Sequence, residues 1–419
     1  MHRFPALSVP QFRLYAATAL LAMAADNIEH VIGYWVIWEL THSPFWLGYA
    51  VVAHWLPFTF FSFYSGSLAD RIDCRKLIQI SQGLYIFSSF GWGFLYLTGQ
   101  LHIWHIAVLL ILHGIAGLIF GPSSMLIIHE MVGKEKLVSA VSINATLRPL
   151  GTTIGPAVGG LLMATVGPGW AFFINSFIYL PLSFAMLFFP YRGAAIKKPN
   201  EGGWSFILEG LTVVRQNSTI VAMLIVVAAT SFLVGNAFQA LIPAFAQRLG
   251  VSSVGYSILL TANGLGAILG GLLLGWSGTT KLRPVMVTAG AIVWSLFLIL
   301  FALSTSYAVS LALLFLVGAT QIVFISMSQS IVQAWAPQAV RGRVIGVYNF
   351  AALGIRVLSG LFMGSLATLV GPSNALVLLA GLIGLVTLVT SIARRGLWEV
   401  EMREEELPAR EARILATGS

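Results

Sequence analysis

The string GSLADRIDCRK at residues 66–76 indicates the fold, because it joins two long apolar stretches, 45–69 and 77–98, through a short loop rich in Lys and Arg. Twelve apolar stretches of this kind run through the sequence. Twenty of the 23 Lys and Arg residues lie in alternate gaps between them or in the two tails. A membrane helix needs about 20 apolar residues, and cytoplasmic loops carry the excess of Lys and Arg. The pattern predicts a multi-pass membrane protein with both termini in the cytoplasm.

The composition excludes an ordinary soluble protein. Hydrophobic residues make up 58% of the 419 positions and charged residues only 9%, with a mean hydropathy of +0.88. Soluble domains average about 25% charged residues. The formal net charge of +8 is accounted for by the topology pattern, so no nucleic-acid partner is expected. The single cysteine, Cys74, excludes an intrachain disulfide.

The spacing predicts an all-α membrane protein of twelve transmembrane helices. We expect four parts: a six-helix bundle over 1–189, a cytoplasmic linker with an amphipathic helix over 190–218, a second bundle over 219–398 and a tail over 399–419. The expected spans are 14–38, 45–69, 77–98, 103–128, 137–165, 170–189, 219–247, 254–276, 285–303, 308–335, 343–370 and 374–393.

The two halves repeat each other. ATVGP at 164–168 recurs as ATLVGP at 367–372, in both cases at the outer end of the fifth span of its half. Many secondary transporters are built from such internal repeats, with a substrate site between the halves near the bilayer midplane. The repeat predicts two pseudo-symmetric six-helix bundles.

The string at 66–76 is more specific than a basic loop. Asp70 ends a helix, where its charge is unfavourable with the helix dipole, so it needs a partner. The pattern G-x-L-A-D-R-x-x-x-R-K resembles the signature of the major facilitator superfamily, except that Asp73 replaces the family's usual glycine. The resemblance implies that Asp70 pairs near the start of the eleventh helix and that the gating residues are Gly66, Asp70, Arg71, Arg75, Arg341 and Arg343.

The fifth span carries GTTIGPAVGG at 151–160, which places glycines at i, i+4 and i+8. Such a stripe lets another helix approach closely, and a proline interrupts it. The string also resembles the antiporter motif of facilitator-family exporters. It departs from that motif at Ser142, and the expected arginine of the fourth helix is absent, with His113 in its neighbourhood. The predicted helix-packing residues are Gly151, Gly155, Pro156, Gly159 and Gly160.

Shorter strings narrow the resemblance to one branch of the superfamily. Their order along the chain resembles the exporter branch that includes the enterobactin exporter and macrolide-efflux proteins. They are LTHSP at 40–44, GIA at 114–116, FIN at 173–175, EGL at 209–211, LIP at 241–243 and RGRV at 341–344.

Ionisable residues within the first span are the candidates for energy coupling. Asp26, Glu29 and His30 are spaced i, i+3, i+4 and share one helix face. Ionisable residues inside a bilayer are functional by default, so we expect these three to take part in proton coupling. The alternative is that an acid forms an ion pair with Arg148 or Arg356 and merely locks helices together; the sequence leaves this open.

Substrate contacts are expected from polar side chains on several spans. The neutral ones among them could equally form hydrogen bonds between helices. Acids, arginines and aromatic residues around one cavity would suit a bulky amphipathic molecule. The predicted substrate-binding residues are Tyr34, His113, Arg148, Asn236, Gln239, Gln321 and Arg356.

The sequence argues against an enzyme. His129-Glu130 begins a zinc-protease pattern, but Gly133 stands where H-E-x-x-H needs its second histidine, and no phosphate-binding P-loop appears. No metal or cofactor is expected. We predict a monomeric secondary transporter of the bacterial cytoplasmic membrane, a proton-coupled exporter of an amphipathic small molecule of drug or siderophore type. The alternatives are a lipid or lysolipid flippase of the same fold and a non-transporting receptor or assembly protein.

Overall fold

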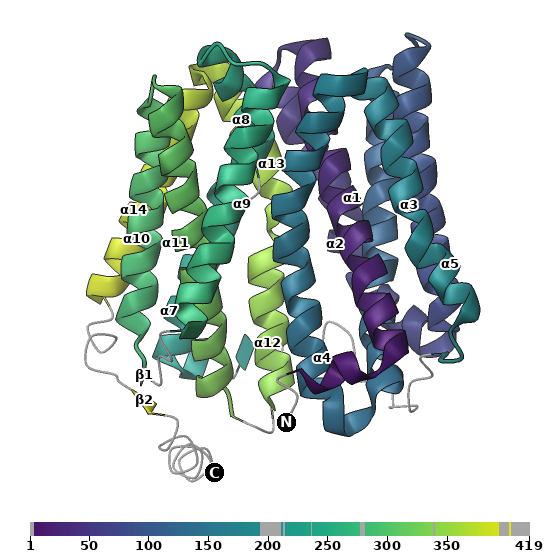
Figure 1. Ribbon diagram of the computed structural model, residues 1–419. Helices are drawn as coiled ribbons and strands as arrows, with labels where there is room; N and C mark the ends of the chain where they lie inside the picture. Colours follow the sequence, from purple (N-terminus) through teal and green to yellow (C-terminus); the bar gives the residue numbers. More distant parts are fainter. Residues whose placement is uncertain are drawn as a thin grey trace. The chain divides into compact units, whose positions relative to one another are not determined.

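The structure is a computed structural model that describes residues 4–192, 211–212, 214–235, 237–276, 281–337, 340–393 and 402–403. Within these ranges, the side chains of residues 62–67, 70–71, 281–282 and 402–403 are not described. Most of the predicted amphipathic helix and nearly all of the predicted tail lie outside the described residues. Among those that are described, the only strands are β1 (Lys281–Leu282) and β2 (Met402–Arg403), which pair antiparallel. All other regular structure is helical (Figure 1).

The first half of the chain supplies six spans. A 3-10 turn, Pro5–Ser8, precedes five helices, and glycines at 133 and 167 interrupt the fourth of them with φ of 69° and 79°. Glycine adopts this left-handed conformation without steric cost, so each interruption divides one span from the next. The helices are α1 (Pro10–Thr41), α2 (Pro44–Arg71), α3 (Cys74–Leu97), α4 (Ile103–Ile178) and α5 (Leu180–Phe188).

The second half supplies six more. Gly235, at φ 46°, separates α7 from α8, and a π-helical turn at Phe350–Gly354 separates α12 from α13. Counted as one span each, these pairs give six helical segments in the described residues of this half, at the places that the sequence predicts. The helices are α7 (Ser218–Leu233), α8 (Ala237–Arg248), α9 (Ser253–Trp276), α10 (Pro284–Leu303), α11 (Tyr307–Trp335), α12 (Arg341–Asn349), α13 (Arg356–Val370) and α14 (Pro372–Ala393).

Hydropathy agrees with a membrane location. Six of the described helices are long and apolar enough to cross a bilayer by length and composition alone, and the α7–α8 pair is a seventh. One of the six is the whole run Ile103–Phe188, which the two glycines divide into three spans.

The repeated V-G-P motif has the same conformation in both halves. Gly167 has a φ of 79° and Gly371 a φ of 84°, and in each case a helical segment resumes at the following proline. Proline is well suited to the first turn of a helix, where its missing N–H is not needed. In each half, the fifth span therefore ends at a glycine with positive φ that is followed by a proline.

Contacts divide the chain into two compact units, residues 1–200 with 239–264 and residues 201–238 with 265–419. In the first unit, α4 packs along α1, α2 and α3, and Phe12 and Tyr15 of α1 are fully buried in the core. In the second, α10 packs against α11 and α14 around the buried Trp294.

The first unit also includes α8 and the first half of α9, which the sequence assigns to the second bundle. Three contacts join them to α1. The indole N–H of Trp38 donates to Gln247 Oε1 over 2.8 Å, and the Tyr256 hydroxyl donates to the Val31 carbonyl over 3.2 Å. The rings of Trp35 and Tyr256 stack with centroids 5.4 Å apart. Together they hold the C-terminal half of α1 against α8 and α9.

Candidate functional site

Small residues bring three helices of the first unit together. Gly151 and Gly155 of α4 lie against α1: a Cβ on Gly151 would be 2.8 Å from the Met23 carbonyl, and one on Gly155 would overlap Asn27. Gly114, earlier on α4, lies directly against the His54 carbonyl of α2. Larger residues at these positions would separate the helices. The close approach is what lets polar side chains of α1, α2 and α4 meet.

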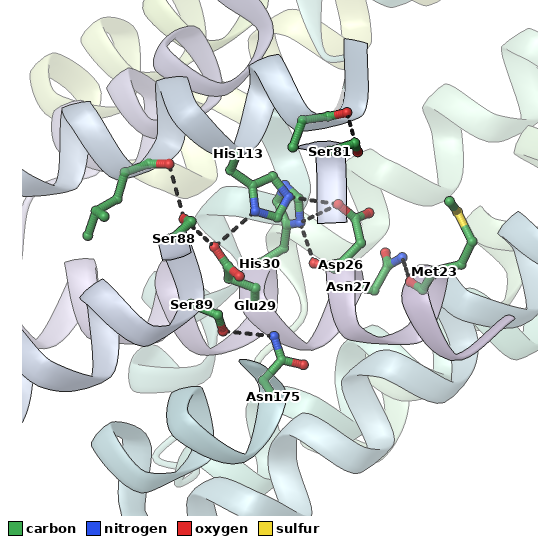
Figure 2. Close-up of polar contacts among 12 residues, drawn as sticks. Met23, Asp26, Asn27, Glu29, His30, Ser81, Ser88, Ser89, His113 and Asn175 are labelled. Atoms are coloured by element: carbon green, nitrogen blue, oxygen red, sulfur yellow. Dashed lines mark hydrogen bonds and ion pairs between the residues drawn. The ribbon is translucent and has the colours of Figure 1, made fainter. Parts of the chain in front are cut away.

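His113 of α4 lies between the two acids of α1. Its side chain is fully buried, with Nδ1 2.9 Å from Glu29 Oε1 and Nε2 2.7 Å from Asp26 Oδ1 (Figure 2). Carboxylates only accept hydrogen bonds, so an imidazolium that donates from both nitrogens satisfies both contacts. His113, predicted as a substrate contact, is thus placed at the centre of the acidic face of α1.

Glu29 is the more deeply buried of the two acids, with 3% of its surface exposed. The Ser88 hydroxyl of α3 donates to Oε1 over 2.8 Å, next to the contact from His113. The second carboxylate oxygen, Oε2, is buried and has no hydrogen-bond partner among the described residues. One oxygen of Glu29 is therefore free to accept a further donor.

Two more histidines complete the group. The Nδ1 of His30 lies 2.7 Å from the backbone carbonyl of Asp26, and its ring centroid is 4.6 Å from that of His54 and 4.9 Å from that of His113. His54 is only 8% exposed, and its Nδ1 is buried with no partner among the described residues. The five residues, called the histidine–carboxylate cluster below, are Asp26, Glu29, His30, His54 and His113.

The cluster places ionisable side chains inside a membrane helix bundle, where a charged group is energetically unfavourable. A carboxylate near the centre of a bilayer costs about 2.5–3.5 kcal/mol on insertion scales, and a buried ion needs pairing and hydrogen bonds. Asp26 and Glu29 obtain both from His113, which could hold or pass on a proton between two carboxylates. Beside them, Tyr34, Trp92 and Leu110 help line a small pocket that also includes Glu29, His30 and His113.

The described arginines and amides that were predicted to bind substrate are spread over α4, α8, α11 and α13. Arg148, exposed on α4, interacts electrostatically with His54, and the ion pairs of Asp26 and Glu29 among the described residues are all with histidines. Gln239 donates to Asn263 over 3.2 Å, a hydrogen bond between α8 and α9.

Two predicted substrate contacts belong to the second unit, and one lies outside the described residues. Gln321 is half-buried on α11. Arg356 is the first residue of α13, one residue beyond the end of the π-helical turn, and interacts electrostatically with Tyr348. Turns of this kind inside helices are frequent at functional sites. Asn236 is the residue that is not described.

Asp73, which replaces the usual glycine of the family signature, stabilises the basic loop after α2. Asp73 caps α3 by accepting from the Arg75 backbone N–H over 3.0 Å, and its Oδ2 lies 2.7 Å from Nη2 of the same arginine. Nη1 of Arg75 also donates to the Phe189 carbonyl at the end of α5 over 2.6 Å. The neighbouring guanidinium lowers the pKa of the Asp73 carboxyl below its ordinary value.

The remaining predicted gating residues are described only in part. Gly66, Asp70 and Arg71 lie in the C-terminal part of α2, and the side chains of Asp70 and Arg71 are not described. Arg341 donates from Nε to the Ala336 carbonyl over 3.4 Å, and Arg343 lies on α12. The pairing of Asp70 with the start of the eleventh span stays a prediction.

Comparison with known proteins supports the fold and the class. Residues 2–413 match the family described as a transmembrane secretion effector within the major facilitator superfamily. The chain is 24% identical to the enterobactin exporter EntS of Escherichia coli O1:K1 over 377 residues, and to that of Shigella flexneri over 380. In each case the alignment covers 87% of this chain and 88% of the relative.

Solved structures show the same fold at low identity. A bacterial homologue of the human lysosomal transporter Spinster, in an inward-facing and unoccupied conformation, aligns with a TM-score of 0.73 and 12% identity, covering 95% of this chain and 98% of that one. The nucleoside transporter NupG aligns with a TM-score of 0.70 and 14% identity, covering 93% and 99%. These likenesses concern the fold alone.

Proposed function

We propose that this chain, which belongs to the transmembrane secretion effector family of the major facilitator superfamily, exports an amphipathic small molecule in exchange for protons. The observation that carries the proposal is the pair of carboxylates on α1, bridged by the buried His113 inside a membrane helix bundle. Ionisable groups are kept at this depth, against their insertion cost, where they serve a transport pathway.

In this proposal, Asp26, Glu29 and His30 carry the coupling protons. Asp26 keeps 23% of its side chain exposed, whereas Glu29 and His113 are buried, so the cluster has an exposed end and an enclosed end. A proton that enters at Asp26 meets His113 directly, and the other nitrogen of that ring contacts Glu29. Exposing the cluster to the two sides of the membrane in turn would couple proton movement to the opposite movement of substrate.

The substrate is proposed to be a drug- or siderophore-type molecule. The named activity of the relatives, enterobactin export, supports that class for this chain. We propose that side chains from both predicted bundles, residues 1–189 and 219–398, contact the substrate. The linker at 190–218 joins the two bundles. The proposed contacts are Tyr34, Arg148, Asn236, Gln239, Gln321 and Arg356.

Gating is assigned to the basic loop and its partner in the second half. Asp70, with Gly66, Arg71 and Arg75, would engage Arg341 and Arg343 in one conformation and release them in the other. We further propose that the chain works as a monomer in the bacterial cytoplasmic membrane with both termini in the cytoplasm. The distribution of Lys and Arg supports that orientation.

The test is a flux assay in everted membrane vesicles that contain the chain. The vesicle interior is acidified, and siderophores, macrolides, cationic drugs and lysolipids are screened for uptake together with proton release. We expect uptake of one class of substrate, accompanied by proton release and abolished by an ionophore. Uptake that continues after the gradient is collapsed would instead indicate facilitated diffusion or lipid flipping. Absence of flux for every class would favour a receptor or assembly protein.

A further inference from the structure

We propose that three histidines of the cluster, His30, His54 and His113, bind a divalent first-row transition-metal ion such as Zn²⁺, with Asp26 as the fourth ligand. One ring nitrogen from each histidine lies within 4.8 Å of the others, although the three residues come from α1, α2 and α4. Imidazole nitrogens and carboxylate oxygens are the usual non-sulfur ligands of Zn²⁺. The inference rests on this ligand set and goes beyond the proposed export function.

The hydrogen bonds of His30 prepare it for a metal. Its Nδ1 lies 2.7 Å from the carbonyl oxygen of Asp26, and a carbonyl can only accept, so Nδ1 carries the hydrogen. The lone pair is then on Nε2. A ring whose tautomer is fixed by a backbone carbonyl in this way is a common arrangement for a metal-ligating histidine.

The ring of His113 is oriented by a carboxylate, as the rings of metal-ligating histidines commonly are. Its Nδ1 lies 2.9 Å from Glu29, whose carboxylate is held in turn by the Ser88 hydroxyl over 2.8 Å (Figure 2). Without an ion, Nε2 donates its hydrogen to Asp26 Oδ1 over 2.7 Å; a bound ion would displace that proton to solvent and take the lone pair of Nε2, while Nδ1 continues to donate to Glu29. An ion bound there would be shared by Nε2 and the Asp26 carboxylate, while Glu29 orients the ring.

His54 provides an independent indication of a missing ligand. It is more than nine-tenths buried, its Nδ1 has no hydrogen-bond partner among the described residues, and its ring centroid is 5.2 Å from that of His113. A buried polar atom without a partner is unfavourable, because it has lost its hydrogen bonds to water. Coordination of an ion shared with the other two rings would satisfy that nitrogen.

The ligand set selects the class of ion. Three imidazoles with one carboxylate suit Zn²⁺, Co²⁺ or Ni²⁺, whereas Mg²⁺ and Ca²⁺ prefer oxygen ligands. Tetrahedral Zn²⁺ with Zn–N bonds of about 2.0–2.1 Å needs nitrogens roughly 3.4 Å apart. The nitrogens lie within 4.8 Å of one another, so binding requires them to move closer by at most about 1.4 Å.

The test uses the full-length protein, purified in detergent without a polyhistidine tag. Zn²⁺ is titrated by calorimetry, and Co²⁺ is followed by its visible absorption, which is intense only in tetrahedral sites. We expect one ion per chain, tetrahedral Co²⁺ bands that Zn²⁺ abolishes, and no binding of Mg²⁺ or Ca²⁺. X-ray absorption at the zinc edge is expected to show three imidazole ligands.

Two ligand variants and a matched histidine control decide whether the ion occupies the cluster. His54→Leu and His30→Gln are each expected to weaken Zn²⁺ binding at least tenfold and to remove the tetrahedral Co²⁺ bands. The control is His102→Ala with His105→Ala, which removes the stacked pair of one exposed and one half-buried histidine that caps the N-terminus of α4. It is expected to leave binding unchanged. Elution as a single species by size exclusion shows that each variant is folded.

Three results would overturn the proposal. Wild-type protein that binds no Zn²⁺ lacks the site. Binding lost in the control but kept in both ligand variants would place the ion at the surface pair, and octahedral Co²⁺ with only oxygen ligands would contradict the histidine set. Because none of these measurements involves transport, failure of the metal site is distinguishable from failure of the export proposal.

Discussion

His113 Nε2 lies 2.7 Å from Asp26 Oδ1, although 87 positions separate the two residues in the sequence. The contact joins α4 to α1, and the same ring pairs with Glu29 through its other nitrogen. Removal of one partner from a buried ion pair typically costs about 3–5 kcal/mol, because the remaining charge stays buried and unpaired. The cluster should therefore respond very differently to the loss of one member and to neutralisation of all members.

We predict that His113→Leu markedly lowers the thermal unfolding temperature in detergent. The triple variant Asp26→Asn, Glu29→Gln, His113→Leu should recover most of that loss, because no buried charge is left unpaired. Unfolding followed by fluorescence of the tryptophans measures both. A triple variant no more stable than His113→Leu would show that shape, rather than charge pairing, dominates at this position.

The glycine stripe of α4 offers a matched pair of substitutions. A Cβ added to Gly155 would overlap Asn27 and lie 3.0 Å from the Ala24 carbonyl oxygen. A Cβ added to Gly159 would lie 3.6 Å from Ile28, which is an ordinary contact. We predict that Gly155→Ala destabilises the protein and reduces transport, because α1 and α4 must separate to admit the methyl group. Gly159→Ala should be close to wild type. Equal behaviour of the two variants in unfolding and flux assays would contradict the packing described here.

The cap at Asp73 predicts a pH-dependent contribution to stability. Loss of a helix N-cap typically costs about 0.5–2 kcal/mol, so Asp73→Ala should lower the unfolding temperature at neutral pH. Because the folded pKa is lowered from 3.8 by Arg75, the ionic part of the contribution is present above that value and is lost as the pH falls through the folded pKa. The difference between wild type and variant should narrow below about pH 3.8.

Asp73→Asn is the control for this prediction, because asparagine keeps the capping oxygen but carries no charge. Its loss at neutral pH should be smaller than that of Asp73→Ala. A difference between wild type and Asp73→Ala that stays constant from pH 7 to pH 3 would show that the charge of Asp73 contributes nothing to stability.

The hydrogen bond between Trp38 and Gln247 predicts a site for conformational trapping. In a Cys74→Ser background, Trp38→Cys and Gln247→Cys can be bridged by a bifunctional methanethiosulfonate reagent. If α1 and α8 separate during each transport cycle, the bridge should stop flux, and a reductant should restore it. The two single-cysteine variants, treated identically, serve as controls. Undiminished flux after complete bridging would mean that this contact persists throughout the cycle.

The fold was largely predictable because its determinants are local. Apolar length, alternating Lys and Arg and the V-G-P repeat each act over a few residues, and together they predicted twelve helical spans. The break at Gly235 and the π-helical turn before Arg356 were not predicted. They depend on how a helix packs against its neighbours, which the periodicity of a single segment does not contain.

The site was predictable only where it lies on one helix. Spacing placed Asp26, Glu29 and His30 on one face, but it could not show that His113 lies between the two acids. Nor could it show that the buried His54 of α2 lies beside them, with an Nδ1 that has no partner among the described residues. The signals for these two histidines were their presence inside apolar spans and, for His113, its place near the arginine expected on the fourth helix. The expectation of no metal came from local motifs, which cannot detect ligands gathered from three helices.

The most direct test of the export account compares Asp26→Asn with Glu39→Gln in everted vesicles that hold equal amounts of inserted protein. Glu39 is an exposed acid of the same helix, nine residues or more from the cluster residues of α1, and it accepts a hydrogen bond from Trp35. It therefore controls for the loss of a carboxylate on α1. The account predicts that Asp26→Asn abolishes both proton release and gradient-driven substrate uptake, while Glu39→Gln retains both. Full proton-coupled uptake by Asp26→Asn would contradict the assignment of the coupling site to the histidine–carboxylate cluster.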